Sequence, residues 1–585
     1  MDIEVKHEEE QPRKKKSFLK KFLIGLGIYL GVCVVLGLVI SMIFSLNYTR
    51  LEKNSVYRID LEGVLVDQAA EENLGDAIIT NLIGKPMTET IGLNDLLNNI
   101  ALAKNNDKIR GIYLRGGELQ AGPSSAKALR DALLDFKESG KFIIAYADSY
   151  TQMTYYIASV ADKIYLNTVG SVAWDGMSAQ KNYYTRLLDK IGVEMQILKV
   201  GTFKSAVEPY FRTSMSEEDR QQTEQYLDGI WSEIKNAVAE KRKITVEQLD
   251  TYADECMSMQ DPAKYLEYGF VDKLVYASDM ENVLREYTGT PDYHIVTHKQ
   301  MNNVERAKNN ADDKVAVIYA EGAISDFGTE GIIEGDMLKI IKKIKDDKDV
   351  KAVVLRVNSP GGSADASEQI WHAVKTLQDK GLPVVVSMGD YAASGGYYIS
   401  CNADYIYAEP TTLTGSIGIF GTIPNVSNLL DTIGLDVDHV ATNRHANLYN
   451  NAIYQGFETE EMAIMQNMVE RGYDLFTKRC AEGRGISQDS IKAIGEGRVW
   501  LGKDALEIGL VDELGNINDA IEKAAQLANL GKYALVDYPE KKDFMGMIQD
   551  LMKDEASPEE KLVMRIREFA AKPRIMALMP EVTIQ

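Results

Sequence analysis

The sequence predicts an α/β protein in which one domain occurs twice in tandem, behind an N-terminal transmembrane helix. Three observations lead to this prediction. The chain has 585 residues, too many for one ordinary hydrophobic core. Short apolar runs alternate with amphipathic stretches of helical period, which is the order expected for parallel strands joined by helices. Large parts of the second half also repeat the first half at a nearly constant spacing.

Matched pairs of residues define the repeat. Arg115 and Arg356 are 241 positions apart, and Tyr155 and Tyr397 are 242 positions apart. A Gly-x-Val-Asp sequence further along returns at an offset of 240. The match spans some 230 residues, which indicates a duplicated domain rather than chance periodicity.

These patterns divide the chain into six segments. They are a basic segment (1–21), a membrane anchor (22–46), the first copy (50–296), a polar linker (297–314), the second copy (315–540) and a tail with helical amphipathic pattern (541–585).

The anchor is predicted from the uncharged stretch 22–46. Its 25 residues are long enough, as a helix, to cross a hydrocarbon core of about 30 Å. Six Lys and Arg residues between positions 13 and 21 precede it, so the N-terminus should stay in the cytoplasm and the rest of the chain outside. A cleaved signal peptide is the alternative, but the apolar run is longer than the usual apolar region of such peptides and no clear A-x-A site follows.

Composition excludes several classes of function. The formal net charge of -22 and the pI near 4.9 argue against a nucleic-acid-binding protein. The four cysteines are scattered without a C-x-x-C pair, and the six histidines show no metal-ligand spacing. We therefore expect neither a disulfide framework nor a bound metal or cofactor.

The candidate nucleophile is Ser394, in the stretch GDYAASGGYYIS that follows a predicted buried strand. Alanines and glycines surround its hydroxyl, which would let a large reactant approach closely. The position 242 residues earlier is Gln152, in DSYTQMTYYIAS, so the first copy has neither the hydroxyl nor the glycine pair. A serine that merely packs in a tight turn is the alternative interpretation.

The candidate base is Lys204, in the sequence KVGTFKSAVEPY of the first copy. At an offset of 240 the second copy has Arg444, which stays protonated and cannot act as a base. A lysine can act as one when burial lowers its pKa. One copy thus retains a nucleophile and the other a base, and copies with facing loops would complete a Ser-Lys site. Taken singly, Lys204 could also be a surface lysine.

Glycines near the serine are candidates for an oxyanion hole. The strand-like AVVLRVN ends in NSPGGS, where Gly361 and Gly362 would leave backbone N–H groups unobstructed, and Gly395 follows the serine. Ser416, in LTGSIGIF, could orient the lysine. Ordinary turns or a helix cap would explain the same sequences. A phosphate-binding loop is disfavoured because the lysine of G-x-x-x-x-G-K is missing.

A histidine base is the main alternative to Lys204. His372 falls in a helix-like stretch, and His439 and His445 border the loop of Arg444. Packing alone does not predict the exchange of a nucleophile and a base between the copies, so the Ser-Lys interpretation is favoured.

Together these motifs resemble the signal peptide peptidase A family, also called protease IV, in its long, duplicated, membrane-anchored form. The resemblance extends over about residues 20–540 and rests on NSPGGSADAS, MGDYAASGGYYIS, LTGSIGIF and GTFKSAVEPY. It implies a Clp and crotonase-like fold for each copy and a Ser-Lys dyad divided between them. Ser394 would be the nucleophile, Lys204 the general base and Ser416 the lysine-orienting hydroxyl. The resemblance also implies a homotetramer.

The expected function is that of a serine endopeptidase anchored by one helix in the bacterial cytoplasmic membrane. It would digest cleaved signal peptides and other apolar peptides at the outer face, with Gly361, Gly362 and Gly395 holding the oxyanion. Two rival functions remain. One is an acyl-CoA hydratase or isomerase, which needs oxyanion glycines but no serine nucleophile, and the other is a non-catalytic membrane scaffold.

Overall fold

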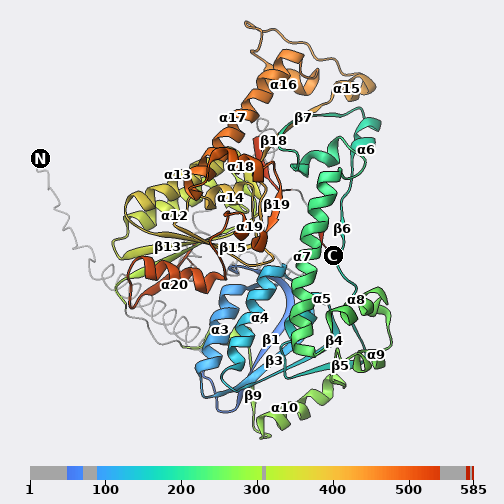
Figure 1. Ribbon diagram of the computed structural model, residues 1–585, viewed down its shortest axis with the longest axis vertical. Helices are drawn as coiled ribbons and strands as arrows, with labels where there is room; N and C mark the ends of the chain where they lie inside the picture. Colours follow the sequence, from blue (N-terminus) through green and yellow to red (C-terminus); the bar gives the residue numbers. More distant parts are fainter. Residues whose placement is uncertain (1–48, 70–88, 306–310, 541–574, 580–582, 585) are drawn as a thin grey trace, which may run out of the picture.

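The computed structural model describes residues 49–69, 89–305, 311–540, 575–579 and 583–584. The predicted anchor at 22–46 and the basic segment before it lie outside these ranges. Across the described ranges, no helix is both long and apolar enough to cross a membrane. Two α/β units lie side by side and are joined by a third sheet (Figure 1).

The first copy is built on a parallel sheet with the strand order β2-β1-β3-β4-β5-β8, and β9 also pairs with β1. Its long strands are rich in buried apolar residues, as in residues 143–147 of β4, with polar residues among them and toward the strand ends. The elements are β1 (Ser55–Val66), β2 (Thr90–Gly92), α3 (Leu93–Asn105), β3 (Ile109–Gln120), α4 (Pro123–Lys137), β4 (Phe142–Tyr150), α5 (Gln152–Ala158), β5 (Lys163–Val172), β6 (Ala179–Gln180), α6 (Thr185–Lys190), α7 (Glu217–Arg242), α8 (Val246–Asp254), α9 (Pro262–Glu267), β8 (Lys273–Leu274), α10 (Met280–Thr288) and β9 (His294–Thr297).

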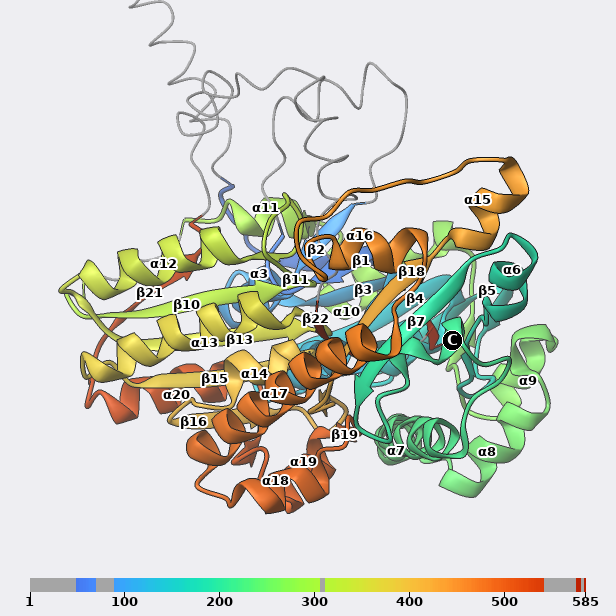
Figure 2. The same cartoon turned by 90° about the horizontal axis from the view of Figure 1, so that it is seen from above.

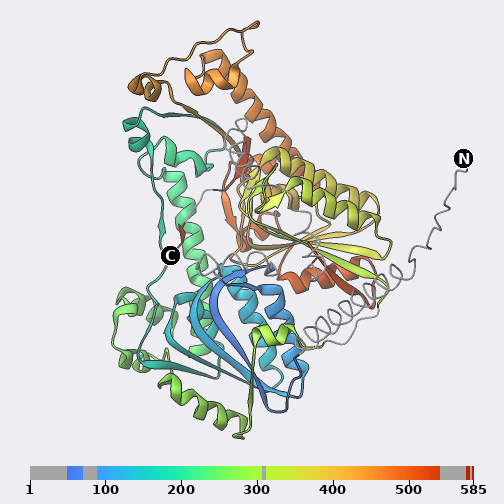
Figure 3. The ribbon, with the colours of Figure 1, turned by 180° about the vertical axis from the view of Figure 1, so that it is seen from behind.

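The second copy repeats this plan in a sheet ordered β19-β17-β15-β13-β10-β21, with β16 beside β15 and β20. Figure 3 shows both sheets from behind, with the strands of the first copy in blue to teal and those of the second mainly in yellow to orange. The elements are β10 (Lys314–Glu321), α12 (Glu334–Asp346), β13 (Val350–Ser359), α13 (Ala364–Asp379), β15 (Val384–Ala393), α14 (Gly395–Ser400), β16 (Tyr405–Ala408), β17 (Leu413–Gly415), α15 (Ser427–Ile433), α16 (Leu448–Tyr454), α17 (Thr459–Arg484), α18 (Gln488–Ile494), β19 (Val499–Leu501), α19 (Gly502–Glu507), β20 (Glu513–Leu514), α20 (Ile517–Leu527) and β21 (Ala534–Tyr538).

Equivalent hydrogen bonds confirm the predicted duplication. The Tyr155 hydroxyl donates to Phe270 O, and the Tyr397 hydroxyl donates to Leu510 O, both at 2.9 Å. The long helices α7 and α17 each have 26 residues. The same tyrosine therefore fastens the same turn in each copy.

The third sheet combines the two copies in the order β12-β11-β14-β22-β18-β7. Strand β7, from the first copy, pairs antiparallel with β18, from the second, along seven residues of each (Figure 2). This pairing carries the turn after β7 into the second copy. The elements are β7 (Glu194–Val200), β11 (Ile324–Ser325), β12 (Ile332–Ile333), β14 (Gly361–Ser363), β18 (Ile419–Asn425) and β22 (Ile575–Leu578).

Two segments differ from the expected pattern. The linker 297–314 contains a short helix, α11 (His298–Asn302), because Thr297 and Gln300 form a capping box that starts it. The described ends of the tail, β22 and β23 (Thr583–Ile584), are strands rather than helix, since each finds a strand partner. The remainder of the tail lies outside the described residues.

Candidate active site

Ser394 occupies the sharp turn between β15 and α14. Its φ is 56° and its ψ is -113°, a strained backbone conformation for a residue other than glycine. The turn is held by the Ser394 N–H, which donates to Gly415 O at 2.8 Å. The small neighbours are required for packing as well, since a Cβ on Gly396 would stand 2.6 Å from Ser359 O.

Lys204 approaches this serine from the first copy. It lies in the turn between β7 and the 3₁₀ helix η1 (Ser205–Tyr210), and its side chain is 0% exposed. Lys204 Nζ lies 2.7 Å from Ser394 Oγ. Burial lowers the pKa of Lys204 well below its usual value, because the ammonium form loses its hydration there. A neutral amine has a lone pair that can accept the proton of the hydroxyl.

Ser416 contacts the same amine from the turn after β17. Lys204 Nζ lies 3.0 Å from both Ser416 O and Ser416 Oγ. The Ser416 hydroxyl donates to Gly497 O at 3.3 Å, which leaves its lone pairs to accept an N–H of the lysine. Both N–H groups of a neutral amine can therefore point at Ser416, with the lone pair directed at Ser394.

The three predicted oxyanion glycines are not equivalent in the structure. Gly361 lies beside Gly395, because a Cβ on Gly361 would stand 2.6 Å from Gly395 N. Gly361 has a φ of 100° and donates its own N–H to Ser359 Oγ at 3.1 Å. Gly362 packs instead against β11, where a Cβ would stand 2.6 Å from Ile324 N. Gly361 and Gly395 are thus brought together, while Gly362 faces the neighbouring strand.

Sequence reasoning missed the residues that hold the Lys204 turn. Asp219, fully buried at the start of α7, accepts hydrogen bonds from Ser205 Oγ at 2.6 Å and Gln222 Nε2 at 3.1 Å. Lys181 Nζ lies 2.6 Å from the same carboxylate. Gln222 also donates to the carbonyl of the residue before Lys204 at 3.2 Å. Both sequence neighbours of Lys204 are therefore tied to α7, by residues on separate segments that no local motif connects.

A buried ion pair joins the two copies behind the site. The side chains of Arg356 and Asp67 are each 2% exposed, and Arg356 Nη2 lies 2.8 Å from Asp67 Oδ1. Nearby, the Asp390 carboxylate accepts the backbone N–H groups of Ser124 and Ser125 at 2.8 and 3.1 Å. Through Ser124 and Ser125 the first copy thus contacts β15, the strand that ends just before the predicted nucleophile Ser394.

The equivalent place in the first copy is closed by larger side chains. Gln152 stands at the position of Ser394 and bonds through its side-chain amide to the backbone N–H and carbonyl of Gly176, at 3.2 and 3.1 Å. By the strand register, the position of Ser416 is taken by Trp174, which is fully buried. The first copy therefore has an amide and an indole where the second has two hydroxyls.

The other sequence candidates lie elsewhere. Arg444 is on the surface and pairs with Glu460 at 2.5 Å. His445, considered above as a base, faces Glu460 and Glu461 at 4.0 and 3.6 Å. Neither side chain takes the place that Lys204 takes beside the serine.

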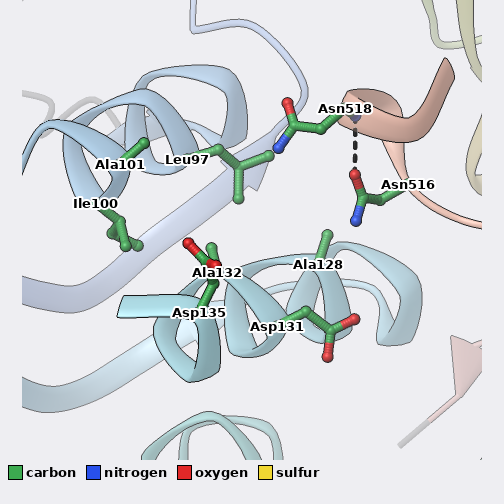
Figure 4. A pocket seen from close by; sticks show the side chains of 9 residues that line it. All are labelled: Leu97, Ile100, Ala101, Ala128, Asp131, Ala132, Asp135, Asn516 and Asn518. Carbon is green, nitrogen blue, oxygen red and sulfur yellow. Dashed lines mark hydrogen bonds between the residues drawn. The ribbon is translucent and has the colours of Figure 1, made fainter. Parts of the chain in front are cut away.

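A separate groove lies between α3, α4 and the start of α20 (Figure 4). Leu97 and Ile100 of α3 line it together with Asp131 and Asp135 of α4, and Asn516 and Asn518 close its end near α20. It contains none of the residues predicted for the active site, so the candidate active site is the turn of Ser394 and not this groove.

Comparison with known proteins gives consistent matches. Residues 135–290 and 376–531 each match the model of Peptidase family S49. Protease 4 of Haemophilus influenzae is 36% identical over 529 residues, which cover 86% of this chain and 84% of that protein. Protease 4 of Salmonella typhi is 36% identical over 92% of this chain and 88% of that protein. The chloroplastic serine protease SPPA of Arabidopsis thaliana is 29% identical over 84% of this chain and 71% of that protein.

One solved structure is also similar in part. A ClpP1 mutant from Listeria monocytogenes matches 35% of this chain and 94% of its own, at 17% identity and a TM-score of 0.25. At that score the likeness carries no argument.

Two α/β domains that both match this family model, together with protease relatives along most of the chain, define the class: the protein is a serine-type peptidase. The family is shown by the matches to both copies and along most of the chain, and the chain belongs to peptidase family S49.

Proposed function

We propose that the protein is an endopeptidase whose dyad is Ser394 as nucleophile and Lys204 as general base. One observation carries this proposal: Lys204 Nζ is 2.7 Å from Ser394 Oγ while its side chain is wholly buried. Burial lowers the pKa of Lys204, so the amine can be neutral at a pH where an exposed lysine is charged.

The reaction would follow from these contacts. Neutral Lys204 accepts the proton of Ser394 as Oγ attacks a peptide carbonyl, while Ser416 keeps the amine oriented. The N–H of Gly395 would hold the oxyanion together with that of Gly361 or Gly362, and the Gly361 N–H would have to leave Ser359 Oγ to do so. The lysine then protonates the leaving amine, and water releases the acyl group by the same route.

The substrates, location and assembly belong to the same proposal. We infer an extended apolar substrate, with cleaved signal peptides as the main class, because the uncharged stretch 22–46 would hold the enzyme at the membrane. A homotetramer at the outer face of the cytoplasmic membrane fits the family resemblance. Membrane fractionation, and analytical ultracentrifugation in detergent, would check the anchor and the assembly separately.

The dyad is tested with Ser394→Ala and Lys204→Met, assayed on a fluorogenic apolar peptide. Each should lower kcat by at least about 10⁴-fold, because members of a catalytic unit act together. The duplication supplies matched controls, Gln152→Ala and Arg444→Met, which change the equivalent positions and should leave kcat within about 2-fold. In the wild type, kcat/KM should rise with pH as Lys204 loses its proton.

Substantial activity in either purified dyad variant would remove the Ser-Lys assignment. A fluorophosphonate probe gives an independent readout, since it should label Ser394 in the wild type and fail in Ser394→Ala. Hydration of an acyl-CoA, with no labelling and no peptide cleavage, would instead support the hydratase. Peptide binding without any turnover would support the scaffold.

A further inference from the structure

A short turn of the second copy, residues 495–498, binds the Lys204 turn of the first copy. It lies between α18 and β19. The Glu496 carbonyl accepts the Phe203 N–H at 2.8 Å. Glu496 Oε2 accepts both the N–H and the hydroxyl of Thr202 at 3.0 Å. The two residues directly before Lys204 are therefore held by a single residue of the other copy.

The residue after Glu496 packs against the lysine itself. A Cβ on Gly497 would stand 2.6 Å from Lys204 Cβ and 2.7 Å from Lys204 N. Gly418 is equally near, since a Cβ there would stand 2.9 Å from Gly497 Cα and 3.2 Å from Lys204 Cδ. These close approaches contribute to the complete burial of Lys204, and burial is what lowers the pKa of its amine.

The 495–498 turn also binds Ser416, whose hydroxyl contacts the lysine amine. The Ser416 N–H donates to Arg498 O at 2.7 Å, and the Ser416 hydroxyl donates to Gly497 O at 3.3 Å. The Arg498 guanidinium lies over Phe203, with Cζ 4.9 Å from the centroid of the ring. One turn therefore connects the predicted base with the hydroxyl that orients it, and contains neither of them.

The first copy shows which part of this arrangement is specific to the site. At the offset of 240 that relates the two Gly-x-Val-Asp sequences, Glu496 corresponds to Cys256. Both residues have a left-handed backbone, with φ of 51° and 55°. Cys256 is exposed, and its thiol lies 4.0 Å from Ser258 Oγ. The backbone conformation therefore belongs to the duplicated fold, whereas only the second copy has a carboxylate at this position.

We propose that Glu496 and Gly497 are positioning residues, which fix the Lys204 turn across the boundary between the copies and keep water from the amine. The proposal rests on the proposed function, because it takes Lys204 to be the base for Ser394. The Glu496 carboxylate acts through Thr202, while Lys204 Nζ contacts the two serines of the site. Without that carboxylate the turn would loosen, water would reach the amine, and the pKa of Lys204 would rise toward its usual value.

The first test is Glu496→Ala, assayed on the fluorogenic apolar peptide across pH. We expect kcat to fall about 10-fold with little change in KM, and the pH at which kcat/KM is half-maximal to rise by about 0.5 or more. Glu496→Gln should recover most of the loss, because an amide oxygen also accepts both hydrogen bonds. Cys256→Ala should stay within about 2-fold of the wild type. A loss of kcat without a shift of the pH profile, or no loss at all, would overturn the positioning role.

A second pair of variants separates the contact with Lys204 from backbone strain. Gly497 and Gly434 have nearly the same φ, 75° and 73°. Among the described residues, a Cβ on Gly434 meets nothing within 4 Å apart from its chain neighbours. Gly497→Ala should lower kcat by about 10²-fold and raise the pH midpoint, whereas Gly434→Ala should lower only the melting temperature. Equal kinetics in the two variants would contradict a role for Gly497.

A measurement without turnover separates this proposal from the proposed function. In a Ser394→Ala background, acetylation of Lys204 by acetic anhydride, followed across pH by peptide mass spectrometry, reports the pKa of the amine, because only the neutral amine reacts. Adding Glu496→Ala should move the midpoint to higher pH. If it moves but the otherwise wild-type protein cleaves no peptide, the hold on Lys204 stands and the endopeptidase falls. If it does not move while the wild type cleaves peptides, the proposed function stands and the positioning role is overturned.

Discussion

The two copies share a scaffold but build one turn in different ways: from β4 to α5 in the first copy, and from β15 to α14, where Ser394 lies, in the second. Tyr155 and Tyr397 make the same hydrogen bond in each, yet the junction between strand and helix is built differently. In the first copy Gln152 is helical, and Thr151 caps the helix with an ordinary φ of -69°. In the second copy Ser394 has a φ of 56°. Because the same junction forms without strain in the first copy, the strain belongs to the site and not to the fold.

The largest expected effect comes from replacing the arginines that stand at the same position of the two copies, Arg356 and Arg115. Arg356→Met should lower the free energy of unfolding by about 3–5 kcal/mol, because it leaves Asp67 buried without its partner. Arg115 is 53% exposed and 3.7 Å from Asp60, so Arg115→Met should cost less than about 1 kcal/mol. Chemical denaturation followed by circular dichroism measures both. Equal losses would mean that the ion pair between the copies has no special role.

A smaller effect is expected where the two long helices begin. Asp219→Asn should lower kcat by about 10²-fold with little change in KM, because the charge that binds Ser205 and Lys181 is lost. At the equivalent position, Glu461 accepts the Glu458 N–H in a capping box. Steady-state kinetics of Glu461→Gln should therefore differ from wild type by less than about 2-fold. Similar losses in both variants would contradict a positioning role for Asp219.

Ser416 of the second copy and Trp174 at the equivalent position of the first copy give a third comparison. Ser416→Ala should reduce kcat by about 10-fold, because Lys204 loses one of the two acceptors that orient it. Trp174→Phe, at the equivalent place in the first copy, should leave kcat unchanged and lower only the melting temperature. A wild-type kcat in Ser416→Ala would show that the backbone carbonyl alone orients the amine.

The smallest effect concerns pH and stability. Burial, followed by the charge of Asp67, raises the pKa of Glu321 to about 7. The folded state therefore holds this proton more tightly than the unfolded state, and stability should fall as pH rises from about 4.5 to about 7. Denaturation across this range should show a shallower decline in Glu321→Gln. Glu62→Gln, at the exposed equivalent in β1, should follow the wild-type curve.

Much of the architecture could be predicted because it depends on local periodicity. Continuous apolar runs became buried parallel strands, and the repeat offsets matched equivalent turns. The contact between Ser394 and Lys204 was expected from comparing the copies and from the family resemblance, since neither stretch alone contains both groups. The roles of Asp219 and Lys181 could not be predicted from the sequence, because their contacts join segments that are far apart in the chain. Strand β22 could not be predicted for a similar reason, because its pairing with β14 and β18 depends on distant residues and not on the hydrophobic pattern of residues 575–578.

The antiparallel pairing of β7 with β18 has a consequence for biosynthesis. On the proposed dyad, the base is translated 190 positions before the nucleophile, and neither copy holds both. At about 5–20 residues per second, the nascent chain spends roughly ten seconds or more with an incomplete site. Because β7 is translated long before β18, the strand pairing that brings Lys204 to Ser394 can form only late in synthesis.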